Sequence, residues 1–463
     1  MASFSRTVFK TLKKNNIVQY RTYVNPFTRT WNILSKEAKS GFKKNYDYDI
    51  EHTDIVVIGG GFIGSSVAYW LKTKAGEGLS VVVLDKDPIY KKSKKIYSHG
   101  VLSQHYSLLE NIYLSQYSGE FLRNIKEHLV EGIDIQFYPH GYLTLASEKY
   151  VNKLENNMSL LKESGINNKL LTVEEIQRAY PWIDTTGIKL GCVSTESEGI
   201  FDANALLNGF IVKSKQLGAC YIQGEVVSFD IERQQDALME GVPPGSYKKT
   251  NTLTYKAEDG QERNLKFAIC IVAAGHESNN IARLLKIGLG DGLLQIGLPI
   301  EKREYNVYSI EETNNDVPAD LNSPYVMDTS GLWLIKNGLR NNVMCGQIPS
   351  FLKDNDISVQ EHMFRTSLTT RYPKLSKSKV KLLSKEVVDC NTYDDSGILG
   401  AHVYHNNLIF ATGFGRQGVQ HSPGIGRAVA ELIIEGQYTT IDLTRFGFDR
   451  LLMDEPLIES NMY

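Results

Sequence analysis

Three glycines and one aspartate make residues 59–85 the part of this sequence best suited to bind a nucleotide. Gly59, Gly61 and Gly64 follow the spacing G-x-G-x-x-G, and Asp85 comes 21 residues after the last of them. In such a turn the glycines permit a tight bend and a close approach of a pyrophosphate, and the acidic residue binds a ribose. The alternative is a glycine-rich turn without a ligand. Because an acidic residue favours a free 2′-hydroxyl, the pattern predicts FAD or NAD rather than NADP.

The segments around these glycines have the patterns of a strand, a helix and a second strand. Residues 55–58 form a short apolar run, as expected of a parallel strand that is covered on both faces. Val67, Ala68 and Leu71 then recur at helical period, and residues 81–84 are a second β-rich run. A helix that begins at this turn directs its free N–H groups and the positive end of its dipole at the phosphates.

Composition argues against several other classes of protein. The chain has 463 residues, 42% hydrophobic and 22% charged, with a net charge of −2. These values are typical of a globular protein of about three domain-sized units, and they give no reason to expect nucleic acid as a partner. The five cysteines are widely spaced without a C-x-x-C pair, which argues against disulfides and metal and fits a reducing compartment. No apolar run of about 18 residues predicts a transmembrane segment.

The amino-terminal 36 residues contain seven basic residues and no acidic one. Phe4, Val8, Phe9 and Leu12 fall on one face of a helix, with the basic residues around them. A basic, amphipathic, acid-free start is typical of a mitochondrial targeting segment, so we expect residues 1–36 to serve in import. The alternative is a disordered basic tail. Residues 37–50 are interpreted as a lead-in to the nucleotide-binding unit.

Two further apolar strands end in glycines, far along the chain from the first turn. Residues 265–273 lead to Ala274 and Gly275, and residues 408–412 run into the glycine-rich loop 413–418 and then a helix. In contrast, residues 135–146, 298–310 and 323–347 alternate like antiparallel strands, which predicts a second domain of that type.

Together these three glycine-terminated elements resemble the D-amino-acid oxidase family of flavoproteins, which includes enzymes that oxidise sarcosine and dimethylglycine. The resemblance implies an α/β fold with a discontinuous Rossmann-type FAD-binding domain and a second, mainly antiparallel β substrate-type domain. The implied FAD-binding domain comprises residues 51–130, 196–289 and 396–442, the substrate-type domain comprises 131–195 and 290–395, and 443–463 form a carboxyl-terminal tail. Further stretches resemble a mitochondrial group within the family that is implicated in respiratory complex I assembly: 107–115, 141–149, 180–182, 328–331, 391–394 and 422–431.

The resemblance also implies roles for individual residues. The first glycine turn would cradle the pyrophosphate, Val226 would meet the adenine through its backbone, and the loop 413–418 would face the flavin ring. For Val226 and Ala274, simple core packing is the alternative. The expected cofactor-binding residues are Gly59, Gly61, Phe62, Ile63, Gly64, Asp85, Lys86, Val226, Ala274, Gly275, Gly413, Phe414, Gly415, Arg416, Gln417 and Gly418.

The chain departs from the family at the flavin loop. Relatives usually read Gly-Phe-Ser-Gly-His-Gly, whereas this chain places Arg416 and Gln417 in that loop. Amine-oxidising members carry a lysine, which pairs with the substrate carboxylate, where this chain has Gln420. Tyr97 stands where some members attach FAD to a histidine, so non-covalent FAD is expected. We expect Arg416 either to stabilise the anionic reduced flavin or to turn outward and pair with a surface carboxylate.

Catalytic residues stay unassigned. The candidates near the ring are His99, His105, Arg416 and His421, and for each histidine a structural role is the alternative. The leading hypothesis is a mitochondrial FAD-dependent oxidoreductase-like protein required for complex I assembly. Its partners would be complex I subunits or assembly intermediates, in the matrix or at the matrix face of the inner membrane, to which it could bind peripherally. The alternative is an active FAD-dependent dehydrogenase or oxidase of a small N-methylated or secondary amine. A flavin-free scaffold would leave both glycine loops unexplained.

Overall fold

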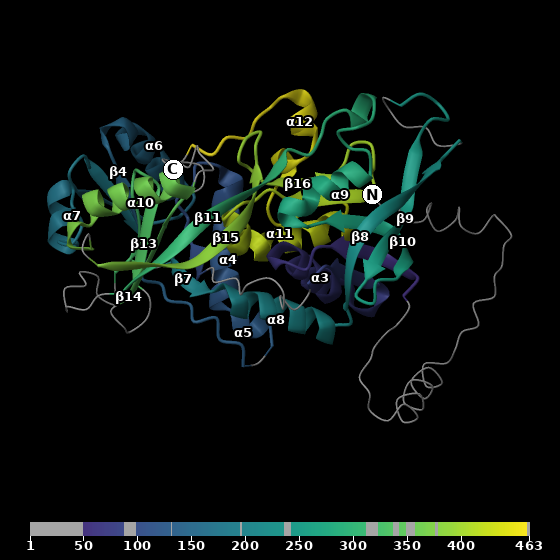
Figure 1. Cartoon of the computed structure of the whole chain (residues 1–463), viewed down its shortest axis with the longest axis horizontal. Coiled ribbons are helices and arrows are strands. Elements are labelled where there is room, and N and C mark those ends of the chain that lie inside the picture. The colour runs from purple at the N-terminus through teal and green to yellow at the C-terminus, as the bar shows by residue number, and fades with distance from the viewer. Residues whose placement is uncertain are drawn as a thin grey trace. The chain divides into compact units, whose positions relative to one another are not determined.

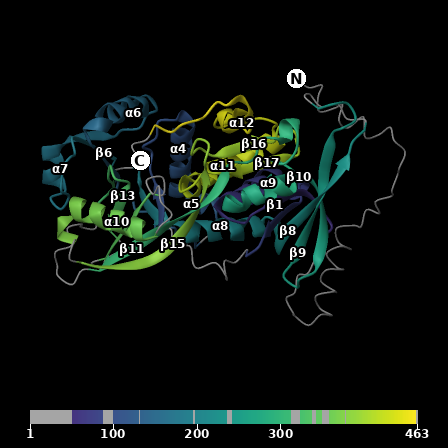
Figure 2. The ribbon, with the colours of Figure 1, turned by 45° about the horizontal axis from the view of Figure 1, so that its top comes forward.

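The computed structural model describes residues 50–87, 99–130, 132–194, 197–235, 242–311, 323–336, 342–348, 357–375 and 378–460. The expected targeting segment 1–36 and residues 37–49 of the lead-in lie outside these residues, as does Tyr97. All of these expectations stay predictions. In both views the eight-stranded sheet with α6, α7 and α10 lies on the left, and the seven-stranded sheet lies on the right (Figures 1 and 2).

The seven-stranded sheet has the order β1-β2-β8-β9-β10-β17-β16, with an additional pairing of β1 and β10. The strands β8, β2, β1, β10 and β17 are parallel, whereas β9 and β16 pair antiparallel with their neighbours. Solid apolar runs in β1, β2 and β17 suit strands covered on both faces. The strands are β1 (His52–Ile58), β2 (Val81–Asp85), β8 (Cys220–Arg233), β9 (Lys248–Ala257), β10 (Glu262–Val272), β16 (Ile398–Ala401) and β17 (Leu408–Thr412).

Helix α3 (Phe62–Ala75) is enclosed between this sheet and other helices. Its residues from Gly64 to Lys72 are all buried, so it packs on every side. At Gly426 of α11 a Cβ atom would lie 2.2 Å from the Ser66 hydroxyl, which means that the two helices approach closely because glycine stands there. The helices of this layer are α3, α4 (Leu109–Arg123), α5 (Ile125–His128), α8 (Ala203–Gln216) and α11 (Gln417–Ile434).

The second sheet has the order β15-β11-β14-β13-β12-β4-β6-β5 and is antiparallel except for the pair β4–β12. The strands are β4 (Tyr142–Ala146), β5 (Lys169–Thr172), β6 (Leu190–Ser194), β11 (Ile300–Glu311), β12 (Tyr325–Met327), β13 (Leu332–Lys336), β14 (Asn342–Gln347) and β15 (Lys379–Asn391). Its helices are α6 (Val151–Glu163), α7 (Val173–Ala179) and α10 (Ile357–Arg371). The small strands β3 (His99–Leu102) and β7 (Gly199–Asp202) pair separately, and the remaining α-helices in the described part are α9 (Ser278–Leu284) and α12 (Asp449–Met453).

The predicted α/β fold with a second, mainly antiparallel sheet is confirmed, but the strand predicted over residues 135–146 is shorter than expected. Within residues 135–146 the strand begins only at Tyr142, because positive φ angles at Gln136 and Gly141 interrupt the extended backbone, and Tyr138 between them forms an isolated bridge with Ile200. All five residues of β4 are buried, so the strand does not alternate. The predicted domain boundaries stay a prediction.

Among the described residues, no helix is long and apolar enough to cross a membrane. Nor do the described side chains include a cluster of three or more His, Cys, Asp or Glu that could hold a metal ion. All five cysteines are free thiols.

Candidate functional site

A cavity of about 1140 Å³ is lined by residues of both sheets and of the glycine loops. Fifteen of the sixteen expected cofactor-binding residues line it. Gly64 does not, because it faces the glycine turn from inside the fold, where a Cβ would lie 1.9 Å from the Gly59 carbonyl oxygen. The lining members are Gly59, Gly61, Phe62, Ile63, Asp85, Lys86, Val226, Ala274, Gly275, Gly413, Phe414, Gly415, Arg416, Gln417 and Gly418.

The first glycine turn presents the N-terminus of α3 to this cavity. Gly59 has φ 103°, and a Cβ there would lie 2.3 Å from the carbonyl oxygen of Ala273 in the neighbouring segment, so no other residue fits. Gly61 is the N-cap residue, and no side chain caps the helix. The N–H groups of a first helical turn have no partner within the helix, which suits them to an anion.

Asp85 at the end of β2 is held beside this turn. Its carboxylate accepts the Gly60 N–H at 2.6 Å and the Asp87 N–H at 2.7 Å. These two bonds fix the carboxylate and leave further lone pairs for ribose hydroxyls. Lys86 next to it is exposed and pairs with the exposed Glu225 at 2.8 Å, a contact that contributes little to stability.

The loop after β17 is held by a residue that the sequence did not mark. Asp389, from β15 of the other sheet, accepts the N–H of Gly413 at 2.6 Å and the N–H of Gly415 at 3.1 Å. Burial raises the pKa of Asp389 to about 6. Cys390 forms a β-bridge with Phe414, whose ring lies where a Cβ of Gly397 would be. The two glycines lie 24 and 26 positions after Asp389 in the sequence, so no local pattern predicts these hydrogen bonds.

Arg416 points from this loop to the second sheet. Its guanidinium donates to the Tyr325 hydroxyl at 3.1 Å and lies 5.5 Å from the ring centroids of both Tyr305 and Trp333. Tyr325 in turn stacks on Tyr142 and on Trp333. The alternative in which Arg416 turns outward to a surface carboxylate is therefore wrong, because the side chain turns into the cavity and meets aromatic groups.

Gln420 is engaged by the protein itself. Its carbonyl oxygen accepts the N–H of Ser103 at 2.9 Å, and its amide nitrogen donates to the hydroxyls of Ser115, at 3.2 Å, and Tyr106. These contacts join α11 to the segment from β3 to α4. Gln420 also lines the cavity, but its amide is already hydrogen-bonded within the protein and links α11 to this segment.

The candidate histidines divide by position. His99 and His105 line the cavity, whereas His421 lies outside it. His105 is buried with its Nδ1 at 2.8 Å from the Thr144 hydroxyl, and burial lowers its pKa to about 3. Burial likewise lowers the pKa of His421 to about 3. Both rings are neutral at physiological pH and hydrogen-bonded within the protein, which favours their structural role.

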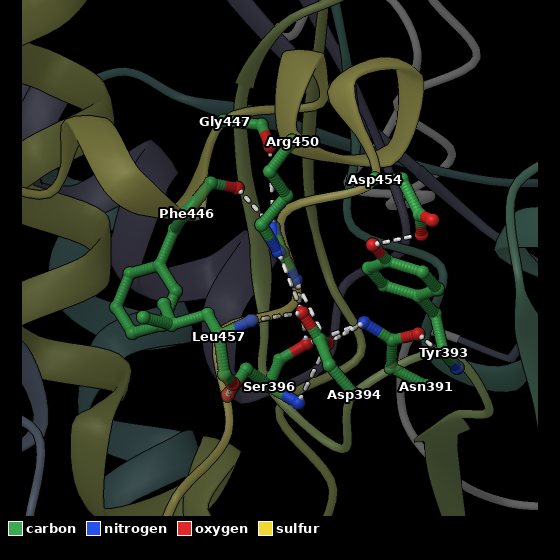
Figure 3. A network of polar contacts seen from close by, with 9 residues as sticks. All are labelled: Asn391, Tyr393, Asp394, Ser396, Phe446, Gly447, Arg450, Asp454 and Leu457. Carbon is green, nitrogen blue, oxygen red and sulfur yellow. Dashed lines mark hydrogen bonds and ion pairs between the residues drawn. The ribbon is translucent and has the colours of Figure 1, made fainter.

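The carboxyl-terminal segment contributes a wall of the cavity through Ile458 and Glu459. It is anchored by the buried pair of Arg450 and Asp394, 2.8 Å apart, and Asp394 also accepts the Leu457 N–H at 2.9 Å (Figure 3). Glu459 lies at the start of α4, where it accepts the Leu108 N–H at 3.4 Å and the Asn111 side-chain amide at 2.7 Å. The described part of the carboxyl-terminal tail, residues 443–460, is therefore packed against the rest of the fold.

Comparison with known proteins identifies the fold and its cofactor. The model of the family "FAD dependent oxidoreductase" matches residues 54–432. The FAD-dependent oxidoreductase domain-containing protein 1 homolog of Drosophila melanogaster is 42% identical, covering 89% of this chain and 81% of its own length. The Xenopus laevis FAD-dependent oxidoreductase domain-containing protein 1 is 37% identical, covering 91% and 87%. The structure of L-proline dehydrogenase from P. horikoshii is similar in fold, with a TM-score of 0.70 at 21% identity, covering 88% of this chain and 100% of that one.

Proposed function

This chain belongs to the FAD-dependent oxidoreductase family, and from that premise we propose that it is a mitochondrial protein required for the assembly of respiratory complex I. Its partners in this proposal are complex I subunits or assembly intermediates, at the matrix side of the inner membrane. The proposal builds on the similarity to FAD-dependent oxidoreductase domain-containing protein 1 over most of the chain.

FAD is the cofactor, and the cavity fits it. The uncapped N-terminus of α3 at Gly61 would hold the pyrophosphate, Asp85 the ribose, and the loop 413–418 the flavin ring. Bound FAD supplies acceptance of two electrons, while the protein contributes orientation and the surrounding charge. We propose that the attachment is non-covalent, so that denaturation releases the flavin into solution.

The observation that carries the assembly role is the state of Gln420. Amine-oxidising members of the family use a lysine at this position to pair with the substrate carboxylate. Here the neutral amide replaces that charge and is held by Ser103, Ser115 and Tyr106. The site lacks this positive charge, and the amide that stands in its place is hydrogen-bonded within the protein. Both features favour a role other than the family's amine oxidation.

The assembly role is tested by complementation in cells that lack the protein. We expect mature complex I to fall and subassemblies to accumulate on native gels, and the full-length chain to restore it. The variant Gly61→Trp, which places a bulky side chain at the N-terminus of α3, reports whether bound FAD is needed. Gly78→Ala is the matched control, because Gly78 is exposed and a Cβ added there would have no atom within 4 Å. Normal complex I in the deficient cells would contradict the assembly role.

The mitochondrial location has its own test. A chain that lacks residues 1–36 should remain in the cytosol while still binding FAD, because the described fold begins only at residue 50. Mitochondrial delivery of the truncated chain at the level of the full chain would show that these residues do not direct import.

A second candidate function is FAD-dependent oxidation of a small N-methylated or secondary amine. The observation that favours it is the extent of the cavity, which continues past the flavin loop to Tyr142, Tyr325 and Met327 of the second sheet. Space bounded by a few polar groups and several aromatic rings is typical of a small-molecule site. Anaerobic spectra of the holoprotein with a panel of such amines test it. Bleaching of the flavin by one amine supports turnover, and unchanged spectra with all of them argue against it.

A further inference from the structure

Strand β15 forms one edge of the eight-stranded sheet and pairs with β11 on one side (Figures 1 and 2). The strand is 13 residues long, and within the described part of the chain no strand pairs with its other side. Its carboxyl-terminal end is covered, because Cys390 forms a bridge with Phe414. The remainder of the edge presents a row of backbone N–H and C=O groups with which a further strand can pair.

Two leucines at this edge are exposed to solvent. Leu382 is 52% exposed and Leu383 is 37% exposed. Leu382 lies opposite Tyr308 of β11, whose ring stacks on Phe364 of α10, so Leu382 and α10 lie on the same face of the sheet. Helix α10 adds two further exposed apolar side chains, Val359 and Met363. Apolar side chains gathered beside an unpaired strand are typical of a surface that binds another chain.

The charges of β15 define the kind of strand that fits. Lys379, Lys381 and Lys385 are all exposed. Lys381 pairs with Glu311 of β11 at 2.5 Å, whereas no acidic side chain of the described residues lies within ion-pair distance of Lys379 or Lys385. The carboxylate of Glu386 on the same strand is engaged by the hydroxyl of Tyr305. Opposite charges on neighbouring strands stabilise a sheet, so acidic side chains suit this edge.

The same features disfavour two other occupants. A second copy of this chain that paired through its own β15 would bring two sets of three lysines to one seam, where like charges repel. A lipid bilayer would cover the leucines but would leave the backbone groups of the edge without hydrogen-bond partners in hydrocarbon. An extended segment of another protein satisfies both the backbone and the side chains.

We propose that the edge of β15 from Lys379 to Lys385 binds an extended segment of a partner protein as an added strand, and that this segment carries acidic side chains beside apolar ones. The inference rests on the proposed assembly role for the identity of the partner, which is a complex I subunit or assembly intermediate. Residues 379–385 do not line the cavity, so a variant of this edge can lose the partner and retain FAD.

The test is photo-crosslinking of the full-length chain in cells that otherwise lack it. Benzoylphenylalanine replaces Leu383 in one variant and Leu289 in the control, because Leu289 is 58% exposed and lies outside β15 and α10. We expect light to join the Leu383 variant to a complex I subunit, at least about fivefold more than the Leu289 variant. Mass spectrometry should place the crosslink in a segment of acidic and apolar residues.

Charge reversal tests the contribution of the lysines. The double variant Lys379→Glu with Lys385→Glu should reduce co-migration of the protein with complex I assembly intermediates on native gels by about fivefold or more, since an exposed ion pair contributes up to about fivefold in affinity. The matched control is Lys249→Glu with Lys256→Glu, two exposed lysines of β9 in the other sheet, and it should stay within about twofold of the parent. Flavin content and melting temperature show that each variant is folded.

Several results would overturn the proposal. These are crosslinks from position 383 to lipid or to a second copy of the chain, equal crosslinking from position 289, and parental co-migration of the charge-reversed variant. If the charge-reversed variant fails to fold, the crosslinks still decide.

Failure of the assembly role is recognised separately. Normal complex I in cells that lack the protein contradicts that role and with it the identity of the partner. If the parent chain is needed for complex I and the charge-reversed variant restores it equally well, the assembly role stands and the binding edge of β15 is refuted.

Discussion

Replacing Gly64 by alanine changes a residue that does not line the cavity, so any effect on FAD must come from packing. A Cβ at this position would lie 1.9 Å from the Gly59 carbonyl oxygen, at least 1.1 Å short of the 3.0 Å that real Cβ contacts respect. Helix α3 has no room to move away from the glycine turn, because α11 is already in close contact with it at Gly426 and Ser66. Overpacking of this kind costs about 1–3 kcal/mol.

The expected result is a loss of FAD affinity that exceeds the loss of stability. A shift of about 1 Å moves the N–H groups of the first turn of α3 beyond the 2.7–3.2 Å range of hydrogen bonds. Each bond lost to a charged phosphate weakens FAD by about tenfold or more.

The assay is titration of the apoprotein with FAD, followed by flavin fluorescence, together with the melting temperature. Gly78→Ala is the control, because it adds the same methyl group at an exposed position with open space around it. If Gly64→Ala binds FAD and melts like the parent protein, the tight contact between the glycine turn and α3 is not what positions the phosphate site.

Two further predictions concern buried groups. Burial lowers the pKa of His105, His402 and His421 to about 3, so each is neutral in the folded state and takes up a proton near pH 6.5 once unfolded. Their contribution to stability is therefore complete above pH 6.5, and about 2 kcal/mol per histidine is lost when the pH falls to 5. Urea unfolding of the holoprotein at pH 7 and at pH 5 measures this loss. His402→Gln is expected to reduce the difference in unfolding free energy between the two pH values. Glu459→Gln weakens the contacts that hold this wall of the cavity at the start of α4, so FAD should be released about fivefold faster, with the exposed Glu455→Gln as control. Equal release rates would show that these contacts do not slow the release of FAD.

The local sequence pattern was sufficient to predict those elements whose structure depends on residues close together in the chain. The strand, glycine turn and helix from residue 52 to residue 75 appear as predicted, since the apolar run, the glycine spacing and the helical period all lie within a few residues. The loop after β17 was predicted for the same reason. The edge strand β15 was missed, because its exposed Lys379, Lys381 and Lys385 hide the usual apolar alternation, as charged residues on an edge strand often do.

From the sequence by itself, the glycine spacing and Asp85 predicted a dinucleotide at the first glycine turn, with FAD and NAD as the alternatives. The family resemblance narrowed this prediction to FAD and predicted that the loop near residue 416 lies with that turn. Only the tertiary structure decided that Arg416 turns inward to Tyr325, that Asp389 holds Gly413 and Gly415, and that Gln420 is already engaged. The physical reason is that each of these contacts joins residues on separate elements. Their partners are chosen by how the two sheets and α11 pack, and neither composition nor periodicity records that packing.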